Sequence, residues 1–232
     1  MSSPKRTARI AGLLYLLGGL PAPFSLLYLP SALIVPGDPA ATANKVRASE
    51  LLLRLGILAD LFSAIVFIFV ALTLYRLLKD VDHHQAMLMV ILWVVSVPVT
   101  FINVLNRLAA LILLSGADFL SLVPRPQLEA MAMVFLRLYN QGNIVNQIFW
   151  GLWLLPFGIL VYKSGFIPRI LGVFLVIACL GYVTASVTTL LSPHYGRMLS
   201  SWMMLPAGLG ELSIVFWLLV KGVRDQPPLE PA

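Results

Sequence analysis

Long apolar stretches separated by short polar breaks dominate the pattern of the chain. Six stretches have roughly 20 residues or more, the length that a helix needs to cross a bilayer. They cover about 9–34, 50–78, 86–114, 131–162, 167–191 and 201–221. The breaks combine Pro, Gly and charged residues, as in Pro36-Gly37-Asp38-Pro39 and Lys163-Ser164-Gly165, which is the chemistry of turns. The pattern predicts an all-α fold: a polytopic membrane bundle of six transmembrane helices in a single domain over 1–232, with a frayed C-terminal tail at 225–232.

Basic residues gather at the ends of these stretches, and their distribution predicts the orientation of the chain. Cytoplasmic loops of membrane proteins carry an excess of Lys and Arg. Nine basic residues flank the spans on the side of the N-terminus: Lys5, Arg6, Arg9, Arg76, Lys79, Lys163, Arg169, Lys221 and Arg224. Four lie on the other side: Lys45, Arg47, Arg125 and Arg197. We therefore expect both termini in the cytoplasm, with residues 36–49 and 115–130 on the outer side.

The composition agrees with a membrane location. Of the 232 residues, 59% are hydrophobic and 11% are charged, whereas a soluble domain carries about 25% charged residues. Too few charges are present to cover a water-soluble globule, which excludes an ordinary cytosolic enzyme, a disordered chain and a secreted disulfide scaffold. The net charge of +6 comes from the basic ends of the apolar stretches, so we expect membrane lipids as partners and no nucleic acid.

Short motifs rich in Gly, Pro and charged residues run through the spans and the breaks. They are Val35-Pro36-Gly37-Asp38, Ser49-Glu50, Arg54-Leu55-Gly56-Ile57, Asp60-Leu61, Asn103, Asn106, Gly151-Leu152-Trp153-Leu154-Leu155-Pro156-Phe157-Gly158, Lys163-Ser164-Gly165-Phe166-Ile167-Pro168-Arg169, Gly172, Gly181 and Tyr182. In these motifs, over nearly its whole length, the chain resembles an uncharacterised family of bacterial integral membrane proteins, the domain of unknown function 4386. The resemblance implies a multi-pass protein of the bacterial cytoplasmic (inner) membrane, and it carries no activity.

Polar residues inside the spans are the candidates for function, because a charged side chain at the centre of a membrane helix costs about 2.5–3.5 kcal/mol. Asp60 and Arg107 lie at the same depth of spans two and three and have opposite charge, so we expect them to pair. Glu211 lies near the middle of span six and has no basic neighbour in its own span. Because desolvation penalises a charged carboxylate, we expect Glu211 to be protonated and to donate a hydrogen bond to an amide oxygen of span four.

Amide and arginine side chains share faces on spans three and four. The spacing i, i+3, i+4 brings side chains together on one side of a helix. It occurs in Asn103, Asn106 and Arg107 and again in Arg137, Asn140 and Gln141, after which span four adds Asn143, Asn146 and Gln147. With Asp60 and Glu211, these residues are the candidate substrate-binding set. Because most of them lie at the midplane or in the outer half, they predict a polar cavity that opens outward.

Structural interpretations stay open for the same residues. Arg54 and Arg137 are placed to snorkel to the outer headgroups, and Asn and Gln in membrane helices are often interhelical contacts. An Asp60–Arg107 pair is as typical of architecture as of binding. Helix breaks at 18–23 in span one and 206–210 in span six suit either a substrate cavity or close packing, with packing favoured for span one.

Motifs for metals and for common catalytic groups are absent from the sequence. No histidine lies inside a span, which excludes intramembrane bis-His haem ligation and a Ser–His protease dyad. The sequence has no His-Glu-x-x-His, Cys-x-x-Cys, phosphate loop or dinucleotide fingerprint. A loop with Asp80, Asp82, His83 and His84 is more typical of a solvated turn than of a metal site. We expect no metal and no cofactor.

Three functions are compatible with these features. The leading hypothesis is the binding or transport of a small anionic or zwitterionic solute that enters from the outer face, with an arginine on its acidic group. A metal-free membrane enzyme that acts on a lipid headgroup or isoprenoid is the second, with Glu211 or Asp60 as general acid or base. A non-catalytic membrane partner or accessory protein is the third. The sequence leaves open which one applies, and it leaves the oligomeric state open.

Overall fold

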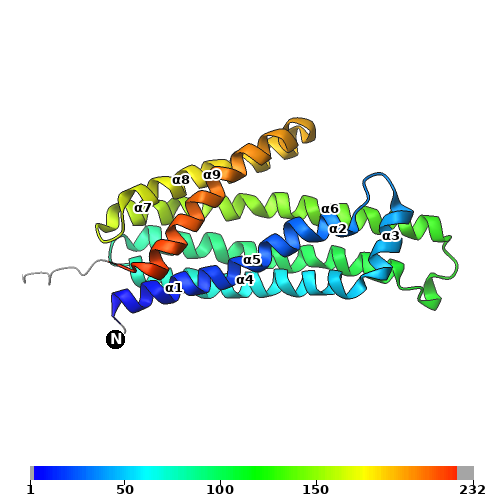
Figure 1. The fold of residues 1–232 in the computed structure, drawn as a ribbon, viewed down its shortest axis with the longest axis horizontal. Helices are drawn as coiled ribbons and strands as arrows, with labels where there is room; N and C mark the ends of the chain where they lie inside the picture. Colours follow the sequence, from blue (N-terminus) through cyan, green and yellow to red (C-terminus); the bar gives the residue numbers. More distant parts are fainter. Residues whose placement is uncertain (1–2, 224–232) are drawn as a thin grey trace, which may run out of the picture. The chain divides into compact units, whose positions relative to one another are not determined.

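The computed structural model describes residues 3–223, without the side chains of 197, 199–201 and 203–207. Over this range the chain is helical and has no strand, which confirms the all-α prediction (Figure 1). The elements are α1 (Pro4–Gly19), the π-helical turn η1 (Pro23–Tyr28), α2 (Leu29–Leu33), α3 (Pro39–Ala48), α4 (Glu50–Leu78), α5 (His83–Leu114), the 3-10 turn η2 (Asp118–Leu120), α6 (Arg125–Leu152), α7 (Leu154–Ser164), α8 (Arg169–Leu191) and α9 (Pro193–Val220). The tail predicted at 225–232 lies outside the described residues.

Five helical segments of the described chain are long and apolar enough to cross a membrane. They are Pro4–Leu33, Glu50–Leu78, His83–Leu114, Arg125–Ser164 and Arg169–Leu191. The sixth predicted span corresponds to α9, in which a shorter apolar helix, Gly208–Val220, was found among the described residues. The count of six spans and the cytoplasmic position of both termini therefore stay predictions.

Helix ends differ from the predicted spans where polar turns continue a helix beyond its apolar part. Helices α5, α6 and α9 begin at His83, Arg125 and Pro193, ahead of the predicted starts. The segment after the first span also contains a helix, α3, that the pattern did not predict. The Asp38 side chain caps it by accepting a hydrogen bond from the backbone N–H of Ala41 at 2.9 Å, and Pro39 occupies its first turn.

The first span is interrupted, as its Gly and Pro residues predict. Helix α1 ends at Gly19, and the chain then forms the π-helical turn η1. The backbone N–H of Leu29 donates to the carbonyl of Phe24, five residues back. The next residue, Pro30, has no N–H to donate to the carbonyl of Ser25. The Ser25 carbonyl is thereby released from the backbone ladder inside a spanning segment.

The fourth predicted span divides at Trp153. Pro156 lies in the first turn of α7 and excludes a regular bond to the carbonyl of Leu152, four residues back, and Leu152 is the last residue of α6. The predicted break in span six is absent, because α9 runs without interruption from Pro193 to Val220.

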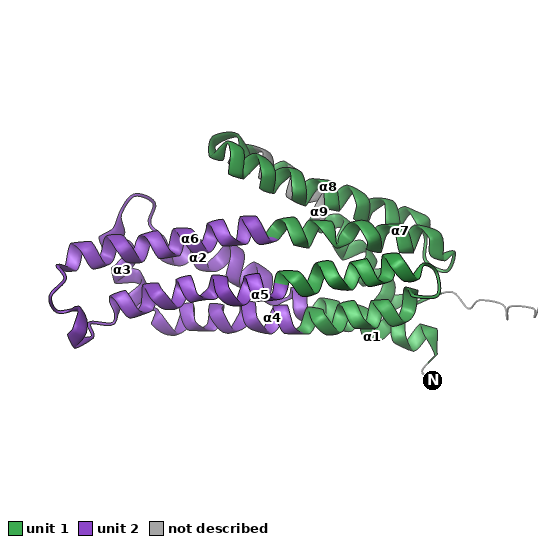
Figure 2. Cartoon of the chain, turned by 180° about the vertical axis from the view of Figure 1, so that it is seen from behind, with its two compact units in different colours: residues 1–16, 66–96, 147–232 green, residues 17–65, 97–146 purple. Residues whose placement is uncertain are grey.

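The helices form two compact units, coloured separately in Figure 2. Unit 1 consists of Met1–Leu16, Val66–Ser96 and Gln147–Ala232, and unit 2 of Leu17–Ile65 and Val97–Asn146. The prediction of a single domain over 1–232 stays a prediction.

Each unit has its own apolar packing. In unit 1 a chain of aromatic contacts links Tyr15, Phe67, Trp93, Trp153 and Phe157, with ring centroids 4.5–5.7 Å apart between successive members. In unit 2 aliphatic side chains from α2, α3, α4, α5 and α6 form one buried cluster. It includes Leu29, Leu33, Val46, Leu53, Ile57, Val104, Leu111 and Leu136.

Candidate functional site

The predicted pair of Asp60 and Arg107 is confirmed in unit 2. Asp60 lies on α4 and Arg107 on α5, and Nη1 of Arg107 is 3.0 Å from Oδ2 of Asp60. The side chain of Asp60 is 10% exposed and that of Arg107 is 3% exposed. A pair this deeply buried is stable only when further hydrogen bonds satisfy both groups, and the structure supplies them.

Ser25 on the π-helical turn contacts both members of the pair. Its hydroxyl donates to Oδ1 of Asp60 at 2.5 Å and accepts from Nη1 of Arg107 at 2.9 Å. Its carbonyl, released from the helix by Pro30, accepts from Nη2 of Arg107 at 2.9 Å. The helix break thus provides two of the oxygens that hold the guanidinium.

Tyr139 on α6 completes the cluster. Its hydroxyl donates to Oδ2 of Asp60 at 2.6 Å, and its ring lies under the guanidinium of Arg107, 3.7 Å from Cζ to the centroid. The carboxylate of Asp60 therefore accepts three hydrogen bonds, from Ser25, Arg107 and Tyr139. We name these four residues the arginine cluster.

Close packing surrounds the arginine cluster and leaves little free space. Gly56 faces it so closely that a Cβ there would lie 2.8 Å from Nη1 of Arg107 and 2.1 Å from a methyl group of Leu29. A cavity of about 10 Å³ adjoins the cluster, lined among others by Arg107, Tyr139 and Asn140. This volume is close to the minimum that holds one water molecule.

A second polar cluster in unit 2 joins the amides of α5 and α6. Nδ2 of Asn103 donates to Oδ1 of Asn143 and to the carbonyl of Tyr139, both at 2.9 Å. Asn106 donates to Asn103 within α5 at 3.2 Å. One turn further along, Asn146 donates to the hydroxyl of Thr100 at 2.8 Å. These amides join two helices to one another, and Asn103 fixes the backbone at Tyr139 of the arginine cluster.

The remaining candidates of span four differ in exposure. Arg137 and Gln141 lie on the exposed face of α6, whereas Asn140 lines the small cavity. Gln147 is half-buried in unit 1. The polar arc of span four therefore divides into an inward set and an exposed pair. Arg54, expected near the headgroups, is exposed and pairs with Glu50 at 2.7 Å.

Glu211 forms a separate site in unit 1, and its predicted partner was wrong. The hydroxyl of Tyr182 donates to Oε1 at 2.7 Å, and the hydroxyl of Tyr15 donates to Oε2. Glu211 accepts in both contacts, and no ion pair links it to any described side chain. Depth along a helix does not determine which neighbour a side chain meets. Here tyrosines of α1 and α8, and not an amide of span four, reach the carboxylate.

Sequence reasoning missed the neutral partners in both sites: Ser25, Tyr139, Tyr15 and Tyr182. A hydroxyl costs less in a membrane than a charge, so these residues did not stand out. A signal was nevertheless present for Ser25, because a proline five residues later leaves its carbonyl without a donor in a π turn. Tyr139, Tyr15 and Tyr182 lie within spans instead of at their ends, where tyrosines of the interfacial belt are expected.

The loop before α5 carries an ion pair. Nζ of Lys163 lies 2.9 Å from Oδ2 of Asp82, and the hydrogen bond from Lys163, aided by the N–H of Gln85, holds the pKa of Asp82 below its usual range. Among the described residues, no group of three or more His, Cys, Asp and Glu side chains is arranged to hold a metal ion.

Comparisons with known proteins identify a family but no activity. A family model described as "Domain of unknown function (DUF4386)" matches residues 10–222. An uncharacterised protein of Archaeoglobus fulgidus is 35% identical over 78 residues, which are 34% of this chain and 44% of that protein. The match thus spans less than half the length of this curated relative. No solved structure matches the chain.

Proposed function

The chain belongs to the family described as domain of unknown function 4386, and we propose that this membrane protein binds a small anionic or zwitterionic solute at Arg107 and carries it across the bilayer. The observation that supports this function is the position of Arg107: a buried guanidinium beside a break in a spanning segment. Interrupted membrane helices commonly supply free carbonyls at the substrate sites of transporters. Here the carbonyl of Ser25 already contacts the guanidinium.

The bonds of Arg107 allow an exchange of anions. Arg107 contacts one oxygen of Asp60, through Nη1. A carboxylate or phosphate of the solute could replace that oxygen, while the hydrogen bond from Nη2 to the Ser25 carbonyl is kept. With an anionic solute, two anions beside one cation would leave net negative charge in a low-dielectric site. We therefore expect one proton to accompany the solute and bind Asp60. The hydroxyl of Tyr139 can then turn from donor to acceptor.

The small cavity indicates what must move. Space for about one water excludes a solute from the conformation described here, so this conformation represents a closed state. The π-helical turn is the element suited to open it, because π turns in helices often lie at functional sites. Asn140, which lines the cavity, is placed to hold a second polar group of the solute.

Binding is tested by ligand-induced stabilisation of the purified protein in detergent. The probes are glycine, L-lactate and inorganic phosphate, which represent a zwitterion, a monocarboxylate and a non-carboxylate anion. At a concentration of about 100 Kd, a ligand that binds the folded state stabilises it by about 2.7 kcal/mol. We expect at least one probe to raise the unfolding midpoint, and failure of all three would contradict the proposal.

The control variants keep the charge balance. Asp60→Asn/Arg107→Gln removes the buried pair without leaving an uncompensated charge, and it should abolish the stabilisation. Glu50→Gln/Arg54→Gln removes an exposed pair from α4, whose side chains are 52% and 53% exposed, and it should keep the response of the wild type.

A second function, that of a non-catalytic membrane partner, is favoured by the completeness of the arginine cluster. All the polar atoms of the Asp60 side chain and the terminal nitrogens of Arg107 have partners within the chain. A purely architectural pair would have the same bonds. Two results together would support this function instead: the wild-type protein binds none of the three probes, and cells tolerate the neutral double variant.

We further propose that the protein lies in the bacterial cytoplasmic membrane with both termini inside. The excess of basic residues on the side of the N-terminus supports this orientation. Single cysteines at positions 44 and 80, both exposed, in a Cys179→Ala background, test it in intact cells. An impermeant thiol reagent should label position 44 and spare position 80, and the reverse would contradict the orientation.

A further inference from the structure

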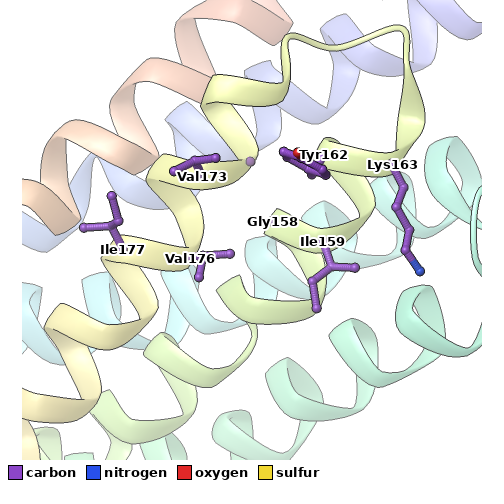
Figure 3. Close-up of a pocket in the computed structure, with 8 residues that line it drawn as sticks. Gly158, Ile159, Tyr162, Lys163, Val173, Val176 and Ile177 are labelled. Atoms are coloured by element: carbon purple, nitrogen blue, oxygen red, sulfur yellow. The ribbon is translucent and has the colours of Figure 1, made fainter.

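An apolar groove runs along the surface of unit 1 between α7 and α8. It encloses about 250 Å³ (Figure 3). Tyr162 and Val173 lie at one end, and Ile159, Val176 and Ile177 line it further along. Val173 and Ile177 are 38% and 44% exposed. The groove is therefore open at the surface of α7 and α8.

Two glycines create the groove by bringing the helix backbones together. A Cβ on Gly172 would lie 2.6 Å from the carbonyl oxygen of Gly158, and one on Gly158 would lie 2.7 Å from that of Gly172. Such small-residue crossings are typical of membrane helices. The larger side chains around this close crossing, among them Ile159, Val173 and Val176, form the walls of the groove.

The length of the groove suits part of a lipid chain. From Arg169, the first residue of α8, to Ile177 is eight residues, or about 12 Å of helix. One leaflet of the hydrocarbon core is about 15 Å thick, half of the ~30 Å bilayer core. A chain that starts at the level of Arg169 and follows the groove would reach most of the way to the bilayer centre.

Basic and aromatic groups mark one end of the groove. The guanidinium of Arg169 lies over the ring of Tyr162, with Cζ 5.6 Å from the centroid, and Tyr162 is 49% exposed. Lys163 borders the groove, and its ammonium group, bound to Asp82, keeps further donors because an ammonium carries three. A tyrosine and two cations at the expected cytoplasmic end of a span match the level of the headgroups.

We propose that this groove is a binding site for an anionic phospholipid of the cytoplasmic leaflet. One acyl chain lies along Val173, Val176 and Ile177, and Arg169 binds the phosphate, a group that its planar fork of donors can contact at two oxygens. Lys163 and Tyr162 lie at the glycerol and headgroup level. All of these residues belong to unit 1. A test of the lipid site is therefore independent of the solute site proposed at Arg107.

Native mass spectrometry of the full-length protein in detergent tests this site. The probes are phosphatidylglycerol and phosphatidylcholine with identical acyl chains, titrated separately. A basic residue near an anionic lipid surface strengthens binding by about fivefold. We expect the first bound phosphatidylglycerol to have an affinity at least about fivefold higher than phosphatidylcholine. Arg169→Gln should weaken the binding of phosphatidylglycerol by about fivefold. Phosphatidylcholine, whose choline cation already neutralises its phosphate, should lose less affinity, so the preference for phosphatidylglycerol should shrink.

Two further variants separate the groove from the general surface. Val173→Trp fills the groove and should reduce the binding of both lipids, whereas Leu180→Trp, at a 62% exposed site on the same helix, should not. Lys79→Gln removes a basic residue elsewhere and should keep the preference for phosphatidylglycerol. Equal affinity for the two lipids, or full binding by Val173→Trp, would overturn the proposal. So would a dimer whose second copy covers the groove and excludes both lipids.

Discussion

Replacing Asp60 with Asn tests whether the arginine cluster has the energetics that its geometry implies. The carboxylate accepts hydrogen bonds from Ser25, Arg107 and Tyr139, whereas an amide has one oxygen and a donor group in place of the other. In the Asp60→Asn variant the amide nitrogen would therefore face at least one donor, and Arg107 would lose its counter-ion.

The expected loss of stability can be estimated from the burial of the pair. Breaking a buried ion pair by removing one partner costs about 3–5 kcal/mol, because the remaining charge stays in the interior. The contacts of Arg107 with the Ser25 carbonyl and the Tyr139 ring persist in the variant, so we expect a loss near the lower limit, about 3 kcal/mol. Glu50→Gln breaks the exposed pair with Arg54 on the same helix and should cost only about 0.3–0.5 kcal/mol.

Unfolding by SDS in mixed micelles, followed by tryptophan fluorescence, measures both losses. Adding Arg107→Gln to Asp60→Asn removes the unpaired cation and should restore part of the stability, with a coupling energy of about 0.5–3 kcal/mol. Two results would refute the reasoning: a loss from Asp60→Asn no larger than that from Glu50→Gln, or strictly additive losses in the double variant.

Three further predictions concern unit 1. Tyr182→Phe removes the hydroxyl that donates to Glu211 at 2.7 Å and should lower the free energy of unfolding by about 1–3 kcal/mol; an unchanged value would mean that water replaces the hydroxyl. Gly172→Ala should destabilise the helix pair strongly in a thermal melt, since its Cβ would meet backbone, whereas Gly19→Ala, with nothing within 4 Å of its Cβ, should not. The lowered pKa of Asp82 contributes stability that is present above the ordinary value of 3.8 and is lost as pH falls through the lowered folded value. The stability difference between the wild type and Asp82→Asn should therefore shrink below pH 3.8, and a difference that is independent of pH would show that the ion pair with Lys163 contributes nothing.

The sequence predicted contacts where charge and depth together determine the partner. Asp60 and Arg107 have opposite charges at one level of neighbouring spans, and a buried charge must find its counter-charge. Glu211 has the same cost of burial, but several neutral groups can satisfy it. That Tyr15 and Tyr182 are its partners depends on how α1, α8 and α9 are rotated about their axes, which the hydropathy pattern does not specify.

The role of the first helix break was harder to predict than its existence. Gly and Pro residues mark the interruption in the sequence, and the structure has it at η1. Packing was the favoured explanation for this break, yet its Ser25 carbonyl binds Arg107. That contact depends on a π-helical register set jointly by Pro30 and by the packing of α4 to α6, and such a register leaves no periodic signal in the sequence. Conversely, the break expected at 206–210 is absent.

The most direct test of the solute site is uptake by purified protein in proteoliposomes that contain a pH-sensitive dye. The wild type should accumulate at least one of radiolabelled glycine, L-lactate or phosphate above protein-free vesicles, and a proton should enter alongside either anionic probe. Asp60→Asn/Arg107→Gln should reduce uptake and proton entry to the protein-free level, and Glu50→Gln/Arg54→Gln should transport like the wild type. Undiminished uptake by Asp60→Asn/Arg107→Gln, or no uptake of any probe by the wild type, would contradict a transport function centred on Arg107.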